Sequence, residues 1–480
     1  MSTAAPVTTA LDEPTAAREL GAKEPTIHGK DRDVEESKDT EAPEQRPKPS
    51  LERWNQPRIN TYRFIVTNYS FIVMGMNDAC VGALIPYIET YYDISYTLVS
   101  LLFLSSFVGY FVAAMSNNLV HHHLGQRGVA VIAPLSRLIG YIPMCLHPPF
   151  AALPPIMMFP GLGNGIEDSA WNAWIGNMEN ANELLGFLHG SYGLGATISP
   201  LIATAMVTKG LAWYQFYYVM IAAAALESLL ATTVFWGATG AVYRATHADA
   251  TGGARTTTRT VIKSPIVWLV AFFFLGYVGA EVSLGGWIVT FMLVVRGAEA
   301  FPAGLTVTFF WLGLTVGRVV LGFITGRIGE KLSITIYLLL SIALQLMYWL
   351  IPSFIASAIF VAFEGFFLGP LFPAAVVAAT KLLPSDYHVA AIGFAAALGG
   401  GGAAIFPFAV GAIASSRGVE VLQPIILAVF VFILLLWFAL PGGLRRGGLE
   451  HARDTDEKVG HQIYRGYGWL RRRSAKKQHR

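Results

Sequence analysis

Twelve apolar stretches, each about as long as a membrane-spanning helix, follow one another between Tyr62 and Leu440. A helix needs roughly 20 apolar residues to cross the hydrocarbon core of a bilayer. The mean hydropathy of the chain is +0.50 and only 14% of its residues are charged, whereas soluble domains have roughly 25%. The pattern predicts an all-α membrane protein with twelve transmembrane helices. The net charge of +3 gives no reason to expect a nucleic-acid partner.

Polar segments divide the chain into two groups of six spans. The first 62 residues hold too little apolar surface to offset the cost of ordering. Basic residues are concentrated in the tails, the central linker and alternate short loops, which predicts that both termini are cytoplasmic. The predicted parts are a disordered cytoplasmic tail at 1–62, a six-helix bundle at 63–240, a cytoplasmic linker at 241–262, a second six-helix bundle at 263–440 and a basic cytoplasmic tail at 441–480.

The two groups of spans are related by an internal repeat. With a shift of 204 positions, Asn77 falls on Glu281 and Gly161 falls on Gly365. The same shift relates further glycines: Gly75, Gly82 and Gly165 fall on Gly279, Gly286 and Gly369. A nearly constant shift across several spans predicts two pseudo-symmetric six-helix bundles. In secondary transporters built in this way, the solute site lies near the middle of the membrane, between the repeats.

The stretch from Gly161 to Pro200 carries an unusual number of polar residues for a predicted membrane region. Glu167 and Asp168 are adjacent acids inside it, and an acid in the middle of a membrane helix costs roughly 2.5–3.5 kcal/mol. At least one of them must therefore face a protein or water-lined interior. Adjacent residues lie about 100° apart around a helix, so we expect Glu167 to face a neighbouring helix.

Asp168 belongs to a polar face of this predicted helix. Asn164, Asp168 and Asn172 are spaced by four residues, so they line one face, and Trp171 lies next to it. Amides and carboxylates can bond hydroxyl groups, and an aromatic ring can pack on the C–H surface of a sugar. This face is predicted to bind a neutral polyol. The alternative is a buried polar network that only holds helices together.

Other spans add polar residues of the same kind. His189 and Tyr192 are three residues apart in the fifth span, and Tyr277 precedes Glu281 by four residues in the seventh. The predicted solute-binding residues are Asn77, Asp78, Asn164, Asp168, Trp171, Asn172, His189, Tyr192, Tyr277 and Glu281.

Four further charges lie inside predicted spans. Arg137 and Glu227, in the third and sixth predicted spans, are interpreted as residues that pair helices. Arg318 is close enough to the end of its span to reach the interface or to pair locally. Glu364 in the tenth span stays open as a site residue.

The loop after the eighth span carries a short motif. It reads GFITGRIGEK and resembles the signature G-x-x-x-D-R-x-G-x-[RK] of the major facilitator superfamily. The matching positions are Gly322, Arg327, Gly329 and Lys331, and Gly326 stands in place of the acid. In that superfamily the loop braces one gating state, so the resemblance implies a gating loop here.

The first-half copy of this loop keeps only Gly125 and Arg127 of the signature. Three adjacent histidines, 121–123, stand in the same loop. We expect a solvated loop rather than a metal site, because a run of adjacent residues does not converge on one ion.

The first half also resembles the fucose–proton symporter family. GLGNGIEDSAWNAW is similar to the fourth span of that family, which implies that Asp168 is its protonatable acid and Asn172 its asparagine. Asn77-Asp78 resembles the Asn-Asp pair of the first span, whose acid belongs to the sugar site. LGFLHGSYGLGATISPLI resembles the fifth span of the animal sodium–glucose relatives. Within this family the chain looks closest to a fungal branch named for bypass of stop codons.

These features predict the major facilitator fold and a proton-coupled symporter of a sugar or similar neutral polar solute, in which Asp78, Asp168 or both load a proton. The expected partners are a small-molecule solute, protons and the lipid bilayer, with the protein acting as a monomer. We expect the plasma membrane rather than the vacuolar membrane, no cofactor, no metal and no enzyme activity. A proton-driven exporter of amphiphilic compounds and a membrane sensor that does not transport are the alternatives.

Overall fold

The computed structural model describes residues 52–247, 263–384, 387–445 and 447–452. These residues are helical almost throughout, with two isolated β-bridges and no named strand among them. The α-helices are α1 (Arg58–Tyr92), α2 (Tyr96–Leu124), α3 (Gln126–Cys145), α4 (Leu153–Gly176), α5 (Ala181–Thr208), α6 (Tyr217–Phe235), α7 (Gly240–His247), α9 (Pro265–Val294), α10 (Ala300–Ile328), α11 (Glu330–Leu350), α12 (Phe354–Leu368), α13 (Leu371–Leu382), α14 (His388–Arg417) and α15 (Leu422–Ala439).

Ten helical segments of the described chain are long and apolar enough to cross a membrane. The helices α4 and α5 are similar in length but carry the polar residues of the stretch between Gly161 and Pro200. One of the ten, Phe354–Leu382, is interrupted between α12 and α13 at Gly369-Pro370, because proline has no amide hydrogen for a helix. Ten segments together with α4 and α5 agree with the twelve predicted spans.

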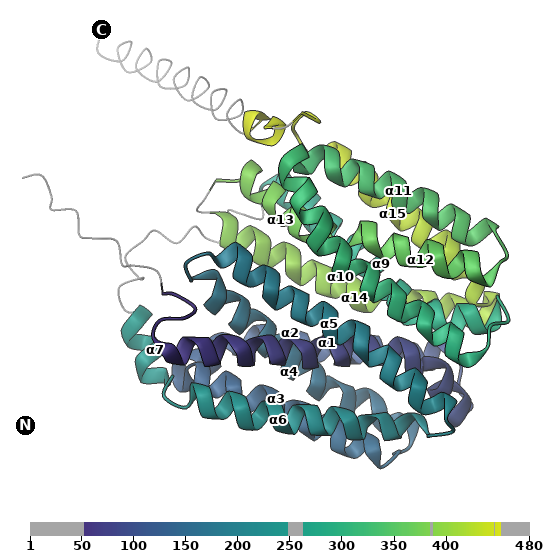
Figure 1. The fold of residues 1–480 in the computed structure, drawn as a ribbon, viewed down its shortest axis with the longest axis horizontal. Coiled ribbons are helices and arrows are strands. Elements are labelled where there is room, and N and C mark those ends of the chain that lie inside the picture. The colour runs from purple at the N-terminus through teal and green to yellow at the C-terminus, as the bar shows by residue number, and fades with distance from the viewer. Residues whose placement is uncertain (1–51, 248–262, 385–386, 446, 453–480) are drawn as a thin grey trace, which may run out of the picture. The chain divides into compact units, whose positions relative to one another are not determined.

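The helices form two groups that lie side by side, α1–α6 in purple to teal and α9–α15 in green to yellow (Figure 1). Inside the first group α1 packs on α5 and α6, α4 packs on α2 and α3, and α3 packs on α6. The second group repeats these contacts, with α9 on α14 and α15, α12 on α10 and α11, and α11 on α15. The predicted internal repeat is therefore present in the packing.

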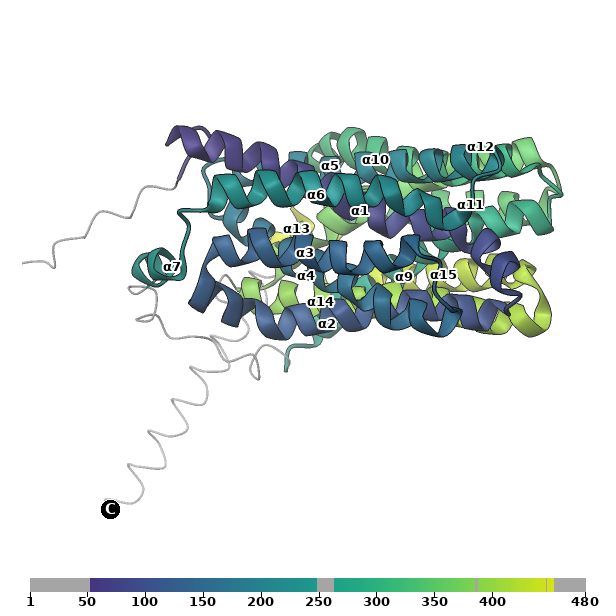
Figure 2. The same cartoon turned by 90° about the horizontal axis from the view of Figure 1, so that it is seen from below.

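Between the groups, α1 contacts α9, α2 contacts α14 and α5 contacts α10. In the internal repeat, α2 corresponds to α10 and α5 corresponds to α14. The contact of α2 with α14 is therefore equivalent to the contact of α10 with α5, as expected for a pseudo-two-fold axis. Figure 2, turned by 90°, shows the helices running nearly parallel to one another. Residues on α1, α2, α5, α9, α10 and α14 can therefore face the junction between the groups.

Glycines permit close packing at the helix crossings. A Cβ atom at Gly161 would lie 2.2 Å from the carbonyl oxygen of Ser106, which belongs to α2. A Cβ atom at Gly82 would lie 2.0 Å from the carbonyl oxygen of Gly285, on the other side of the junction. Any side chain at these two positions would therefore force the helices apart.

The two groups contact each other at the end that holds the α1–α2 and α9–α10 loops. The backbone N–H of Thr97 donates to the hydroxyl oxygen of Ser415 at 2.8 Å, and the two side-chain hydroxyls also lie 2.8 Å apart. The ring of Tyr96 packs edge-on against that of Trp287, with centroids 5.5 Å apart. These contacts close that end of the junction.

Two predicted boundaries need correction. Helix α1 begins at Arg58, so the tail predicted for 1–62 ends earlier. Asn60 explains the early start, because its side-chain amide donates to the carbonyl oxygens of Arg53 and Gln56 and holds the preceding turn. The predicted linker at 241–262 begins inside α7. The rest of the linker, residues 1–51 and residues 453–480 lie outside the described residues.

Candidate functional site

Asp78 lies on α1 at the point where α4 and α5 approach it. Its Oδ1 accepts hydrogen bonds from the side-chain amides of Asn77 at 3.0 Å and Asn164 at 2.8 Å. Its Oδ2 accepts from the hydroxyl of Tyr192 at 3.1 Å. The side chain is half-buried. Three of the predicted site residues therefore surround a fourth, and all three donors are uncharged.

Arg137 on α3 is the centre of a second set of contacts, and its side chain is fully buried. Its Nη1 lies 2.6 Å from both carboxylate oxygens of Glu227 on α6. Its Nη2 lies 2.7 Å from Oε2 of Glu167 on α4. Both expectations, that Arg137 and Glu227 pair helices and that Glu167 faces a neighbour, are confirmed.

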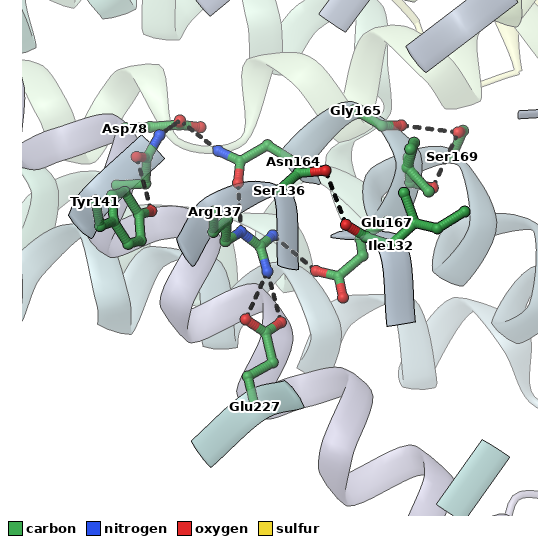
Figure 3. A network of polar contacts seen from close by, with 12 residues as sticks. Asp78, Ile132, Ser136, Arg137, Tyr141, Asn164, Gly165, Glu167, Ser169 and Glu227 are labelled. Carbon is green, nitrogen blue, oxygen red and sulfur yellow. Dashed lines mark hydrogen bonds and ion pairs between the residues drawn. The ribbon is translucent and has the colours of Figure 1, made fainter. Parts of the chain in front are cut away.

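Asn164 joins these two sets of contacts (Figure 3). Its Oδ1 accepts from Nε of Arg137 at 2.9 Å, while its amide nitrogen donates to Asp78. Behind them, the hydroxyl of Tyr141 donates to Oδ1 of Asn77 at 2.9 Å and fixes that amide. A continuous chain of polar contacts therefore runs from α6 through α3 and α4 to α1.

The network contains more acid than base. Arg137 supplies one positive charge, whereas Glu167, Glu227 and Asp78 would supply three negative charges if all were ionised. A buried charge that is not balanced by a counter-charge is expensive. The Oε1 atom of Glu167 has no hydrogen-bond partner among the described residues. The arrangement favours a proton on at least one of these carboxyls.

Asp168 and Asn172 lie further along α4 and pair with each other. The Asn172 amide donates to the Oδ1 of Asp168 at 2.9 Å and to its carbonyl oxygen at 2.8 Å. Both side chains are half-buried, whereas Asn164 on the same predicted face is fully buried. The face therefore divides into an inner amide that belongs to the Arg137 network and an outer acid–amide pair.

Trp171 does not lie on this polar face. Its side chain is fully buried and stacks on the ring of Phe235 from α6, with centroids 4.5 Å apart and an angle of 24° between the rings. It is one residue from Asn172 but points towards the core of the first group. The structure places Trp171 in helix packing, so the prediction that it stands beside the solute is not supported in this conformation.

His189 and Tyr192 also separate. Tyr192 reaches the Asp78 carboxylate, as described above. The ring of His189, one turn earlier on α5, packs edge-on against Phe71 with centroids 5.8 Å apart. The neighbouring Ser191 donates to the side-chain oxygen of Asn68 at 2.8 Å. Polar side chains thus extend along the contact between α1 and α5 on the N-terminal side of Tyr192.

The second group contributes an ion pair at the junction. Nη2 of Arg318 on α10 lies 3.6 Å from Oε1 of Glu281 on α9. Nε of Arg318 also donates to the carbonyl oxygen of Gly369 at 3.1 Å. Tyr277 is fully buried and lies beside both charges. Arg318 is therefore paired locally, and its partner is one of the predicted site residues.

Sequence reasoning did not place Arg137, Glu227, Tyr141 or Arg318 in the site. Arg137 and Glu227 could have been found from the excess of acids among the intramembrane charges of the first half, because buried acids need a counter-charge. Arg318 could have been found from Glu281, an intramembrane acid on the preceding span. In both cases the missing information was which helices are neighbours.

The predicted gating loop is mostly helical, because Gly322 and Arg327 belong to the end of α10, Lys331 belongs to the start of α11, and Gly329 lies between the two helices. Lys331 is buried, and its Nζ donates to the carbonyl oxygens of Trp437 at 2.6 Å and Leu440 at 2.7 Å, at the end of α15. Gly329 adopts a positive φ of 105° between the two helices. Gly322 and Arg327 are exposed. Within the described residues, the loop therefore holds α15 through Lys331.

The histidine run ends α2 and packs against α7. The carbonyl oxygen of His122 accepts from Arg244, and the ring of His121 lies 5.3 Å from that of Tyr243. The described residues contain no group of three or more His, Cys, Asp or Glu side chains that could hold a metal ion. These contacts attach α7 to the end of α2.

A family model described as Major Facilitator Superfamily matches residues 68–363 and 301–465 of the chain. Among curated proteins, the chain is similar to Bypass of stop codon protein 6 of Saccharomyces cerevisiae (strain ATCC 204508 / S288c). The two are 29% identical over 406 residues, which cover 77% of this chain and 80% of the relative.

Two kinds of solved structure share the fold. A D-xylose-proton symporter superposes with a TM-score of 0.63 at 13% identity, covering 79% of this chain and 97% of that one. A point variant of the E. coli fucose:proton symporter superposes with a TM-score of 0.55 at 14% identity, covering 78% of this chain and 98% of that one. At such low identity these matches concern the fold alone.

Proposed function

Because this chain belongs to the major facilitator superfamily and is therefore a membrane transporter rather than an enzyme, we propose that it is a proton-coupled symporter of a sugar or a similar neutral polar solute. It works by alternating access, with the solute bound at the junction between the two groups of helices. Related folds are found in symporters whose names specify D-xylose and fucose.

The surroundings of Asp78 are the observation that carries this proposal. The carboxylate is half-buried and is held by uncharged donors from Asn77, Asn164 and Tyr192. Amides and a phenol can exchange their hydrogen bonds for those of solute hydroxyls without breaking an ion pair. The donors therefore suit a neutral solute that is rich in hydroxyl groups.

The same surroundings suit proton coupling. Asp78 has no ion-pair partner within 4.0 Å in the described structure, so a proton can neutralise it without releasing a cation into the interior. In the closed intermediate of the transport cycle, a buried neutral carboxyl has a lower free-energy cost than an ionised one. In this mechanism the solute and the proton bind together. Release of both on the other side of the membrane allows the empty carrier to return to its starting conformation.

Asp168 is the second proton-binding candidate. It is half-buried, and its hydrogen-bond partner Asn172 is uncharged. Asp78 is joined to the Arg137 network, whereas Asp168 is paired within one helix. We place the coupled proton on Asp78, with Asp168 as the acid that passes protons to and from Asp78.

The proposed orientation puts both termini in the cytoplasm, on the basis of the basic residues in the tails and linker. The closed end with Thr97 and Ser415 then faces away from the cytoplasm, so its contacts must break when the site opens to the outside. We place the protein in the plasma membrane, where this orientation supports uptake of an external solute.

The test is uptake of a panel of radiolabelled sugars and polyols into proteoliposomes, with and without an imposed proton gradient. We expect the gradient to drive accumulation of at least one neutral solute. Asp168→Asn should abolish gradient-driven accumulation, and Asp93→Asn, at the exposed end of α1, is the matched control. Gradient-driven efflux of amphiphilic dyes with no sugar uptake would favour an exporter, and an absence of any flux would favour a sensor.

A further inference from the structure

Glu364 on α12 is a buried acid that the proposed transport site does not use. Its side chain is fully buried inside the second group of helices. Neither carboxyl oxygen has a hydrogen-bond partner among the described residues. An ionised carboxylate in such a place would be one of the most expensive groups in the molecule.

Helix α11 presents a row of polar side chains beside α12. Ser341, Gln345 and Tyr348 are spaced by four and three residues, so they line one face of α11, and all three are fully buried. Helix α11 packs on α12, and Arg296 donates to both the carbonyl oxygen of Tyr348 and the hydroxyl of Ser357 on α12. From α15, Gln423 accepts a hydrogen bond from the Gln345 amide at 2.8 Å. A cluster of buried polar side chains therefore lies inside an otherwise apolar bundle.

Many polar atoms of this cluster lack protein partners. Besides the two Glu364 oxygens, four atoms have no hydrogen-bond partner among the described residues: Oγ of Ser341, Oε1 of Gln345, the hydroxyl of Tyr348 and Nε2 of Gln423. Buried polar atoms are normally satisfied. The set includes both donors and acceptors, which suits internal water and a protonated acid rather than a metal ion, because a metal requires acceptors only.

Within the described part of the chain, no positive charge balances Glu364. Arg296, in the α9–α10 loop, is a cation on the same side of the bundle. It is engaged elsewhere, because its Nε donates to Ser357 at 3.0 Å and its Nη2 donates to the carbonyl oxygen of Tyr348 at 2.6 Å. On α10, which also packs on α12, Arg318 is paired with Glu281. The titratable side chain in the buried polar row of α11 is the phenol of Tyr348.

We propose that Glu364 is a second proton-binding site, inside the second group of helices and separate from the junction, where the carboxylic acid is held in a hydrated polar cluster with Tyr348, Gln345 and Gln423. The carboxyl keeps its proton at neutral pH. This site does not depend on the identity of the solute or on whether Asp78 couples transport to protons. Its test is therefore made on the purified protein without a transport assay.

Infrared spectroscopy of the full-length protein in detergent tests the proposal. We expect the C=O stretch of a protonated carboxyl at neutral pH, reduced in Glu364→Gln, because that variant removes the acid and keeps its shape. Glu330→Gln is the matched control. Glu330 is the first residue of α11 and forms an ion pair with Lys381 at 2.7 Å, so its substitution should leave the band unchanged.

Thermal stability gives an independent readout. Glu364→Gln should be more stable than the wild type at neutral pH, because a carboxyl that stays protonated in the folded protein releases its proton on unfolding. The difference in stability should shrink as the pH falls into the ordinary titration range of a carboxyl, where both states of the wild type hold the proton. An unchanged infrared band in Glu364→Gln would overturn the proposal. So would a Glu364→Gln variant that is less stable than the wild type at neutral pH, since an acid that keeps its proton there makes the wild type the less stable of the two.

Discussion

Asn164 lies between an acid and a base that belong to different helices, with its amide nitrogen 2.8 Å from Asp78 and its amide oxygen 2.9 Å from Arg137. An amide can make both bonds at once because it has a donor and an acceptor on the same group. A change in the charge of Asp78 therefore alters the hydrogen bonds of Asn164, and through them the surroundings of Arg137.

Replacing Asn164 with leucine should break this connection. The change leaves Asp78 with one donor fewer and the Nε of Arg137 unpaired. A hydrogen bond to a charged group contributes roughly 1.5–3 kcal/mol, so gradient-driven uptake should fall by roughly ten-fold or more. Asn177→Leu is the control, because Asn177 is exposed and donates only to the carbonyl oxygen of Ala173. Equal uptake by both variants would count against a role for the connection.

Removal of the Arg137 side chain should destabilise the fold. Arg137→Ala leaves Glu167 and Glu227 buried without a counter-charge, and breaking a buried pair in this way costs about 3–5 kcal/mol. The measurement is thermal unfolding in detergent. The half-exposed pair of Arg53 and Glu179 provides the comparison, since an exposed pair contributes about 0–1 kcal/mol. If Arg53→Ala lowered the unfolding temperature as much as Arg137→Ala, burial would not be the cause.

A cross-link between Thr97 and Ser415 should lock the junction. Their hydroxyl oxygens lie 2.8 Å apart, so cysteines at both positions can approach the geometry of a disulfide. Oxidation of Thr97→Cys/Ser415→Cys should abolish uptake, and a reductant should restore it. The native cysteines, Cys80 and Cys145, are buried and free, so they should not interfere.

The single-cysteine variants are the controls for this experiment, and oxidation should leave their uptake unchanged. Uptake that persists in the fully cross-linked double variant would show that this end does not open during transport.

Much of the fold followed from hydrophobicity and repetition. Apolar length locates spans because the bilayer imposes one thickness on every helix. The repeat predicted two related bundles because equivalent glycines, such as Gly161 and Gly365, serve equivalent helix crossings. The early start of α1 at Arg58 was not predictable in this way, because it depends on hydrogen bonds from the polar side chain of Asn60.

The candidate site was only partly predictable. Spacing on one helix grouped Asn164, Asp168 and Asn172 correctly on one face of α4. Spacing cannot show which neighbouring helix a given side chain contacts. The contact of Asn164 with Arg137 was therefore not predicted, and Trp171 was predicted beside the solute rather than against Phe235. Those outcomes depend on the packing of α4 against α3 and α6, which is a property of the assembled bundle.

The most direct measurement of the central claim is proton movement caused by the solute. Proteoliposomes without a pH gradient are given a solute found in the uptake panel, and the external pH is followed with an impermeant dye. The account predicts that the external pH rises with the wild type and stays constant with Asp78→Asn. The variant should still bind the solute and equilibrate it, because asparagine resembles the protonated acid. A rise in pH with Asp78→Asn equal to that of the wild type would contradict the account.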